Sequence, residues 1–159
     1  MSFVTIFFVL IGLLFATAFL TKRRFGVLGL ALTAGAMLST LWVGDLTPII
    51  ANAGIILVKP PLQSVVAAFL ILLPALLLLA SGSTYKSGRQ RFVGAAAFAI
   101  LAIALLLEPL GSALVIDGIG RSVYDFFTRY RTIIITICLV LAVLDLLMTK
   151  TPKKARKEY

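Results

Sequence analysis

Between Ser81 and Phe92 the chain reads Ser-Gly-Ser-Thr-Tyr-Lys-Ser-Gly-Arg-Gln-Arg-Phe, a polar run with three basic residues and no acidic one. Apolar runs long enough to cross a bilayer lie on both sides of it. A basic, polar break between two such runs is typical of a loop on one side of a membrane. The break therefore predicts a multi-spanning membrane protein, and its charge bears on the orientation of that protein.

The composition of the whole chain points to the same class. Of its 159 residues 61% are hydrophobic and 13% are charged, whereas soluble domains have about 45–50% apolar and about 25% charged residues. The apolar runs are continuous and do not alternate with polar residues, which argues against a membrane β-barrel. We therefore expect an all-α, polytopic integral membrane protein.

Five apolar runs could form transmembrane helices. The first is followed by a basic cluster and has no positive charge before it, so we read it as a retained spanning helix and not as a cleaved signal peptide. A short basic tail, residues 150–159, follows the last run. The expected spans are residues 2–21, 25–44, 62–80, 92–107 and 132–149, which form one helical domain.

Two connecting segments are too long for simple turns. Residues 45–63 contain an apolar stretch, residues 49–58, that is too short to span. Asn52 and Gly54 interrupt this stretch, and Pro48, Pro60 and Pro61 bracket it. This segment either lies at the interface as a connection or re-enters the membrane beside a pore. Residues 111–131 place apolar side chains on one helical face and charges on the other, which predicts an amphipathic helix on the membrane or the bundle.

The basic residues give the orientation. With five crossings, eleven of the fifteen lysines and arginines fall on one side, so the N-terminus should lie outside and the tail in the cytoplasm. Topology and contact with anionic lipid then explain the net charge of +9, and we expect no nucleic-acid partner. The candidate lipid-contacting residues are Lys22, Arg23, Arg24, Lys86, Arg89, Arg91, Lys153 and Lys154.

Small residues recur on one face of two expected helices, where they would let helix backbones approach closely in lipid. This pattern predicts a packing interface, either within the chain or between chains. The residues are Ala31, Gly35 and Ser39 in the second run and Ala95, Ala99 and Ala102 in the fourth.

The chain offers few groups for chemistry. It has no histidine and a single cysteine, Cys138, which excludes an internal disulfide, a metal or haem site built from its own His or Cys, and a Ser-His-Asp site. Asp145 is the one acidic residue inside an expected span. It is either a proton- or cation-binding carboxylate or an interfacial carboxylate paired with Lys22, Arg24, Arg91 or the basic tail. We expect no catalytic residue and no cofactor.

Two stretches that open expected helices share a form, Lys22-Arg23-Arg24-Phe25-Gly26 and Arg89-Gln90-Arg91-Phe92-Val93-Gly94. Over Met1–Trp42 and Arg89–Leu110 the chain resembles the colicin V production proteins, a family of small bacterial inner-membrane proteins. The resemblance implies a non-enzymatic role in secretion or envelope homeostasis and carries over no catalytic residue. That family has four crossings, from which the fifth helix and basic tail expected here depart.

These observations favour a non-enzymatic accessory or structural protein of the bacterial inner membrane. Its partners would be membrane lipids together with other membrane-protein subunits or further copies of itself. The alternative is a small oligomeric channel or transporter in which residues 45–63 are re-entrant and Asp145 lies on the ion path.

Overall fold

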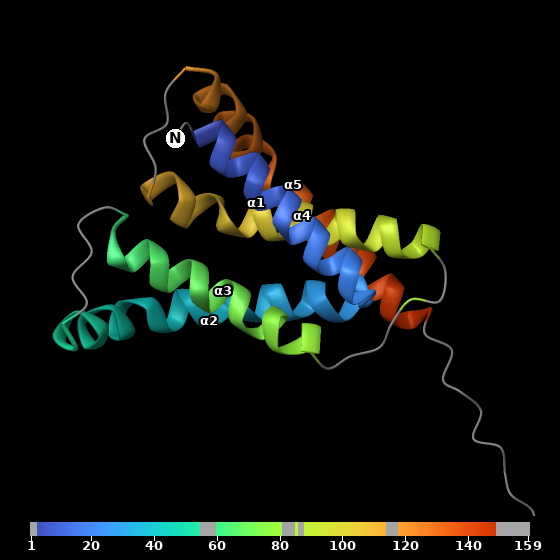
Figure 1. The fold of residues 1–159 in the computed structure, drawn as a ribbon, viewed down its shortest axis with the longest axis horizontal. Helices are drawn as coiled ribbons and strands as arrows, with labels where there is room; N and C mark the ends of the chain where they lie inside the picture. The colour runs from blue at the N-terminus through green and yellow to red at the C-terminus, as the bar shows by residue number, and fades with distance from the viewer. Residues whose placement is uncertain (1–2, 55–59, 81–84, 86–87, 114–117, 149–159) are drawn as a thin grey trace, which may run out of the picture.

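The computed structural model describes residues 3–54, 60–80, 85, 88–113 and 118–148. Those residues form five helices and no strand (Figure 1). The helices are α1 (Phe3–Thr21), α2 (Phe25–Asn52), α3 (Leu62–Ala80), α4 (Gly88–Ala113) and α5 (Ile119–Leu147). The prediction of an all-α fold is confirmed for this part of the chain.

Four of these helices, α2 to α5, are long and apolar enough to cross a membrane. The apolar part of α1, Thr5–Thr21, is shorter. Helices of this length and composition indicate a membrane protein.

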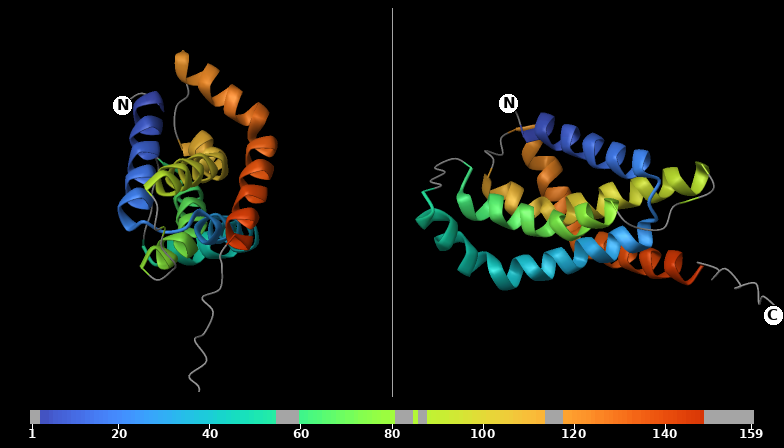
Figure 2. Two further views of the ribbon diagram at one scale, coloured as in Figure 1. Left: turned by 90° about the vertical axis from the view of Figure 1, so that its right-hand side faces the viewer. Right: turned by 60° about the horizontal axis from the view of Figure 1, so that its bottom comes forward.

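Helix α4 lies at the centre of the bundle and contacts each of the other four helices (Figure 2). Its residues 101–107 are all buried, so this part of the helix is enclosed on every side. The sequence explains the placement, because Leu101–Leu107 is apolar all round and such a helix is stable only when its whole surface is covered. The remaining helices pack around α4, with α2 and α3 as an antiparallel pair.

Small residues bring α2 close to its neighbours. A Cβ atom at Gly35 would collide with the carbonyl oxygen of Ile71 in α3, so the two backbones touch at this point. A Cβ atom at Gly26 would lie 2.6 Å from the carbonyl oxygen of Ala142 in α5. The six predicted packing residues are all buried inside the single chain: Ala31, Gly35, Ser39, Ala95, Ala99 and Ala102.

Helix α2 is longer than the sequence indicated, since it continues past Gly44 and through Pro48 to Asn52. Proline has no backbone N–H and displaces the carbonyl one turn earlier, which often ends a helix. Here the Thr47 hydroxyl donates a hydrogen bond to the Val43 carbonyl over 2.6 Å, next to the Gly44 carbonyl that Pro48 leaves without its helical donor. The helix nevertheless continues to Asn52. The expected break at residue 45 is absent, and the first half of the 45–63 segment belongs to α2.

Helix α4 likewise continues past Pro109, where the sequence predicted its end, to Ala113. The carbonyl of Ala104 accepts a hydrogen bond from Arg131 Nε over 3.1 Å. The Ser112 hydroxyl donates to the carbonyl of Pro109 over 3.1 Å. The carbonyl that Pro109 leaves without its helical donor is that of Leu105, so the bond from Arg131 lies on the adjacent carbonyl and does not replace the lost one. Pro109 is itself buried in the bundle, and this tertiary burial cannot be read from the local sequence.

The expected amphipathic connection over residues 111–131 does not exist as a separate element. Its first three residues belong to α4, residues 114–117 lie outside the described residues, and residues 119–131 are the first half of α5. The sequence has no proline or glycine between Arg121 and Leu147, so nothing interrupts the helix where the apolar run begins. The amphipathic and apolar runs therefore form one helix of 29 residues.

Candidate functional site

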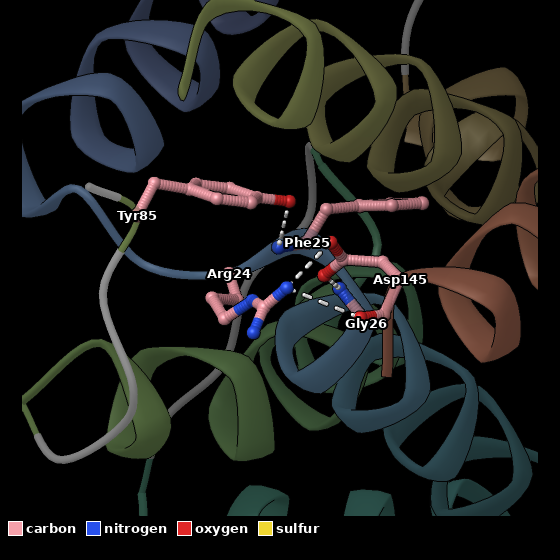
Figure 3. A network of polar contacts seen from close by, with 5 residues as sticks. All are labelled: Arg24, Phe25, Gly26, Tyr85 and Asp145. Atoms are coloured by element: carbon pink, nitrogen blue, oxygen red, sulfur yellow. Dashed lines mark hydrogen bonds and ion pairs between the residues drawn. The ribbon is translucent and has the colours of Figure 1, made fainter. Parts of the chain in front are cut away.

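A cluster of polar contacts joins three segments that are far apart in the sequence (Figure 3). Arg24, Phe25 and Gly26 lie where α2 begins, Tyr85 lies between α3 and α4, and Asp145 lies near the end of α5. The cluster sits at the end of the bundle that carries most of the described basic residues.

Asp145 caps the N-terminus of α2 from another helix. Its Oδ2 accepts a hydrogen bond from the Gly26 N–H over 2.9 Å, and its Oδ1 lies 3.3 Å from Arg24 Nη2. Arg24 itself occupies the N-cap position and makes no side-chain capping bond. A carboxylate at this position satisfies a free N–H and interacts favourably with the helix dipole. Both oxygens of the candidate ion-binding carboxylate are thus engaged within the protein.

Tyr85 holds the turn between α1 and α2. Its backbone N–H donates to the carbonyl of Lys22 over 2.8 Å, and its phenolic oxygen accepts from the Phe25 N–H over 3.1 Å. Lys22 has a φ of +56°, a left-handed conformation that often ends a helix. Burial raises the pKa of the Tyr85 phenol, the hydrogen bond from Phe25 lowers it, and the Asp145 carboxylate raises it. The phenol therefore stays protonated near neutral pH.

Two further arginines cap the C-terminal ends of helices. Arg23 donates from Nε to the Leu79 carbonyl over 3.0 Å and from Nη2 to the Ala80 carbonyl over 2.8 Å. Arg91 donates to a carbonyl at the end of α1, that of Phe19, and its guanidinium lies 3.8 Å from the centre of the Phe19 ring. A cation at a helix C-terminus satisfies free carbonyls and offsets the negative end of the dipole. Arg23, Arg24 and Arg91 are therefore used to hold the bundle together.

Of the other predicted lipid-contacting residues, two are exposed in the structure and three lie outside the described residues. Arg89 is exposed, and no described residue pairs with its side chain. Lys22 is also exposed, while Lys86, Lys153 and Lys154 lie outside the described residues.

At the opposite end of the bundle, a cavity of about 470 Å³ lies between α2, α3, α4 and α5. Ser64 and Ser112 both line it, and their hydroxyl oxygens are hydrogen-bonded to each other over 2.8 Å. Arg131 Nη1 lies 3.1 Å from Glu108 Oε2, and the Glu108 side chain is 77% exposed. The polar residues that line the cavity are Ser39, Thr40, Gln63, Ser64, Glu108, Ser112 and Arg131.

The cavity is closed toward the middle of the bundle. Ile71 and Leu105 are among its lining residues. One helical turn further in, Leu32, Ala75 and Leu101 are at most 1% exposed and belong to the apolar core. Within the described residues of one chain the cavity is therefore a blind polar pocket.

The residues predicted for a re-entrant segment are separated by the structure. Pro48 and Asn52 lie in the last turns of α2, and Gly54 follows with a φ of +90°. Pro60 and Pro61 form the turn before α3, where Pro61 lines the polar pocket. Residues 55–59 lie outside the described residues, and the re-entrant alternative stays a prediction.

Sequence reasoning did not find most of the pocket or the role of Tyr85. Ser64 and Ser112 are ordinary residues of apolar helices, and they meet only because α3 and α4 pack together. Arg131 stands directly before the apolar run of α5, and its position 23 residues after Glu108 carries no recognisable pattern. The one available signal was that Glu108 and Arg131 are charges at the borders of apolar runs, where interhelical pairing is common.

Across the described ranges, no three histidine, cysteine, aspartate or glutamate side chains group to hold a metal ion. Comparison with models of protein families, with curated proteins and with solved structures finds no match for the chain.

Proposed function

We propose that the protein crosses the bacterial inner membrane five times, with the N-terminus outside and the C-terminus in the cytoplasm. Support for a fifth crossing comes from α1, whose 19 residues correspond to about 28 Å of helix beside a hydrocarbon core of about 30 Å. Support for the orientation comes from the basic connections after α1 and α3 and the basic tail, which then share the cytoplasmic side.

Labelling of single cysteines tests this topology. In a Cys138→Ala background, Ser83→Cys should react with an impermeant maleimide only after the cells are opened, and Asp125→Cys should react in intact cells. Asp125 is exposed in the first half of α5, on the opposite side of the proposed membrane from Ser83. Reaction of the Ser83 variant in intact cells would contradict the orientation.

Within that membrane we propose a non-enzymatic role as an accessory or structural subunit of a larger complex. The observation that supports it is the exposure of α5, since only 11% of its most apolar 18-residue window is buried. One stripe of this helix, Ile133, Val140, Val143 and Leu147, is 46–75% exposed. We call these four residues the outer α5 face. A stripe of large apolar side chains on a spanning helix suits packing against a helix of another subunit as well as against lipid.

The partner set after gentle detergent purification tests the subunit role. We expect the chain to purify with another membrane protein, and Val140→Trp on the outer α5 face to reduce that recovery at least fivefold. Met37→Trp is the matched control, because Met37 is a large apolar residue that is 68% exposed on a different helix, α2. Purification as a lone monomer with lipid only would contradict the proposal. The secretion or envelope role implied by the family resemblance would then also lose its support.

The blind polar pocket favours transport as the second candidate function. A polar cavity in one half of a bundle resembles one half of an alternating-access path. In this conformation the cavity ends at the apolar core and does not continue to the other side of the bundle. Reconstituted proton or potassium flux that Glu108→Gln abolishes and Asp125→Asn preserves would favour transport over the subunit role. Both substitutions remove one exposed carboxylate, so they alter the charge equally.

A further inference from the structure

An apolar groove runs along the seam between α4 and α5. One part of it, about 390 Å³, is lined only by apolar side chains, among them Ala96 and Ala97 of α4 and Ile134 and Ile137 of α5. A second part, about 420 Å³, shares Ala97 with the first, so the two parts are continuous. We call them together the α4/α5 groove. The side chains of Ala96 and Ala97 are too short to reach α5 across the seam, so the space between the two helices stays open.

The groove ends in a positive charge at the basic end of the bundle. Arg89 and Gln90 line this end and belong to the first turn of α4, whose dipole favours an anion. Asp145 also lines it, but both of its oxygens are already engaged by Gly26 and Arg24. Arg89 is the one arginine of the two basic connections whose guanidinium no described residue engages.

The length of the groove matches one leaflet. From Arg89 to Ile100 the eleven steps along α4 correspond to about 16 Å of helix, which is about half of a hydrocarbon core of about 30 Å. A lipid acyl chain that lies in the groove would thus reach from the level of the headgroups to the middle of the bilayer.

From the charge and the length we infer that the groove holds a phospholipid with an anionic headgroup, taken from the leaflet on the basic side. One acyl chain lies along Ala96 and Ala97, and the phosphate pairs with Arg89 beside the Gln90 amide. This lipid differs from the surrounding bilayer lipid because two helices enclose its chain and a free guanidinium faces its phosphate. The assignment to the cytoplasmic leaflet rests on the proposed topology.

Native mass spectrometry of the full chain tests the site. Detergent-purified, delipidated protein is titrated with phosphatidylglycerol and, separately, with phosphatidylcholine of the same acyl chains. We expect one phosphatidylglycerol to be retained at least fivefold more than phosphatidylcholine. Arg89→Ala should remove most of this preference, a loss of about fivefold for one basic residue at a membrane surface. Arg129→Ala, which removes an exposed arginine from the opposite end of α5, should leave it unchanged.

The acyl chain is tested by filling the groove. Ala97→Leu should abolish retention of both lipids, whereas Val143→Leu on the outer α5 face should preserve it. If Ala97→Leu lowers the unfolding temperature, Ile137→Trp fills the same space from a side chain that is 55% exposed. Equal retention of the two lipids by the unmodified chain, or unchanged retention by a folded groove-filling variant, would overturn the inference. Neither result bears on cysteine labelling at Ser83 or on partner recovery, so the site and the proposed function fail separately.

Discussion

Gly35→Ala is expected to destabilise the contact between α2 and α3 more than any other single-methyl change in the bundle. The added Cβ atom would meet the carbonyl oxygen and carbon of Ile71, which are backbone atoms and cannot rotate away. The two helices must move apart along the pair, and overpacking of this kind costs about 1–3 kcal/mol. For a chain of this size the unfolding temperature in detergent should fall by about 2–12 °C.

Gly44→Ala is the matched control for this prediction. Gly44 lies in the same helix, and a Cβ atom there would have nothing within 4 Å. Circular dichroism of both variants during heating measures the difference. If Gly35→Ala melts at the temperature of the unmodified protein, the backbones of α2 and α3 do not touch as described.

Asp145→Asn should produce the second large effect, because it removes the charge that pairs with Arg24 and caps α2. Arg24 Nε is buried and already lacks a partner among the described residues, so losing the carboxylate leaves a poorly compensated cation. Breaking a fully buried pair costs about 3–5 kcal/mol, and the 16–19% exposure of these two side chains lowers our expectation to about 2–3 kcal/mol.

A double-mutant cycle separates the pair from the cap. Arg24→Gln and Asp145→Asn together should cost less than the sum of the two single variants, by about 1 kcal/mol or more. Asp125→Asn removes an exposed carboxylate from the same helix and should leave thermal unfolding nearly unchanged. If the loss of stability in the double variant equals the sum of the losses in the two single variants, the two side chains are not coupled.

The helical class could be predicted because it depends on local properties. Continuous apolar runs separated by basic breaks can be recognised directly in the sequence. Helices α2 and α3 begin at Phe25 and Leu62, as these runs predict. Small residues at four-residue spacing, which are equally readable along the chain, indicate a close-packed helix face. What these patterns leave open is which helix packs against that face.

Helix ends were the least predictable feature, since they depend on tertiary packing. Pro48 and Pro109 lie inside α2 and α4, although a proline often ends a helix. Pro109 is buried in the bundle, and Arg131 of α5 bonds to the Ala104 carbonyl in the turn before it. The same limit applies to Asp145, which accepts a hydrogen bond from the N–H of Gly26, 119 residues earlier, in the first turn of α2. Contacts of this kind follow from tertiary packing and produce no periodic pattern in the sequence.

The central position of α4 also has a consequence for biosynthesis. A ribosome releases α1 first, yet the main packing partner of α1 is α4 and not its neighbour in the chain, α2. A nascent chain that ends at Ala80 would therefore hold the α2–α3 hairpin, while α1 would still lack its main packing partner. Arrival of α4 joins the two parts, so premature termination before Gly88 should yield a product that quality-control proteases recognise and degrade.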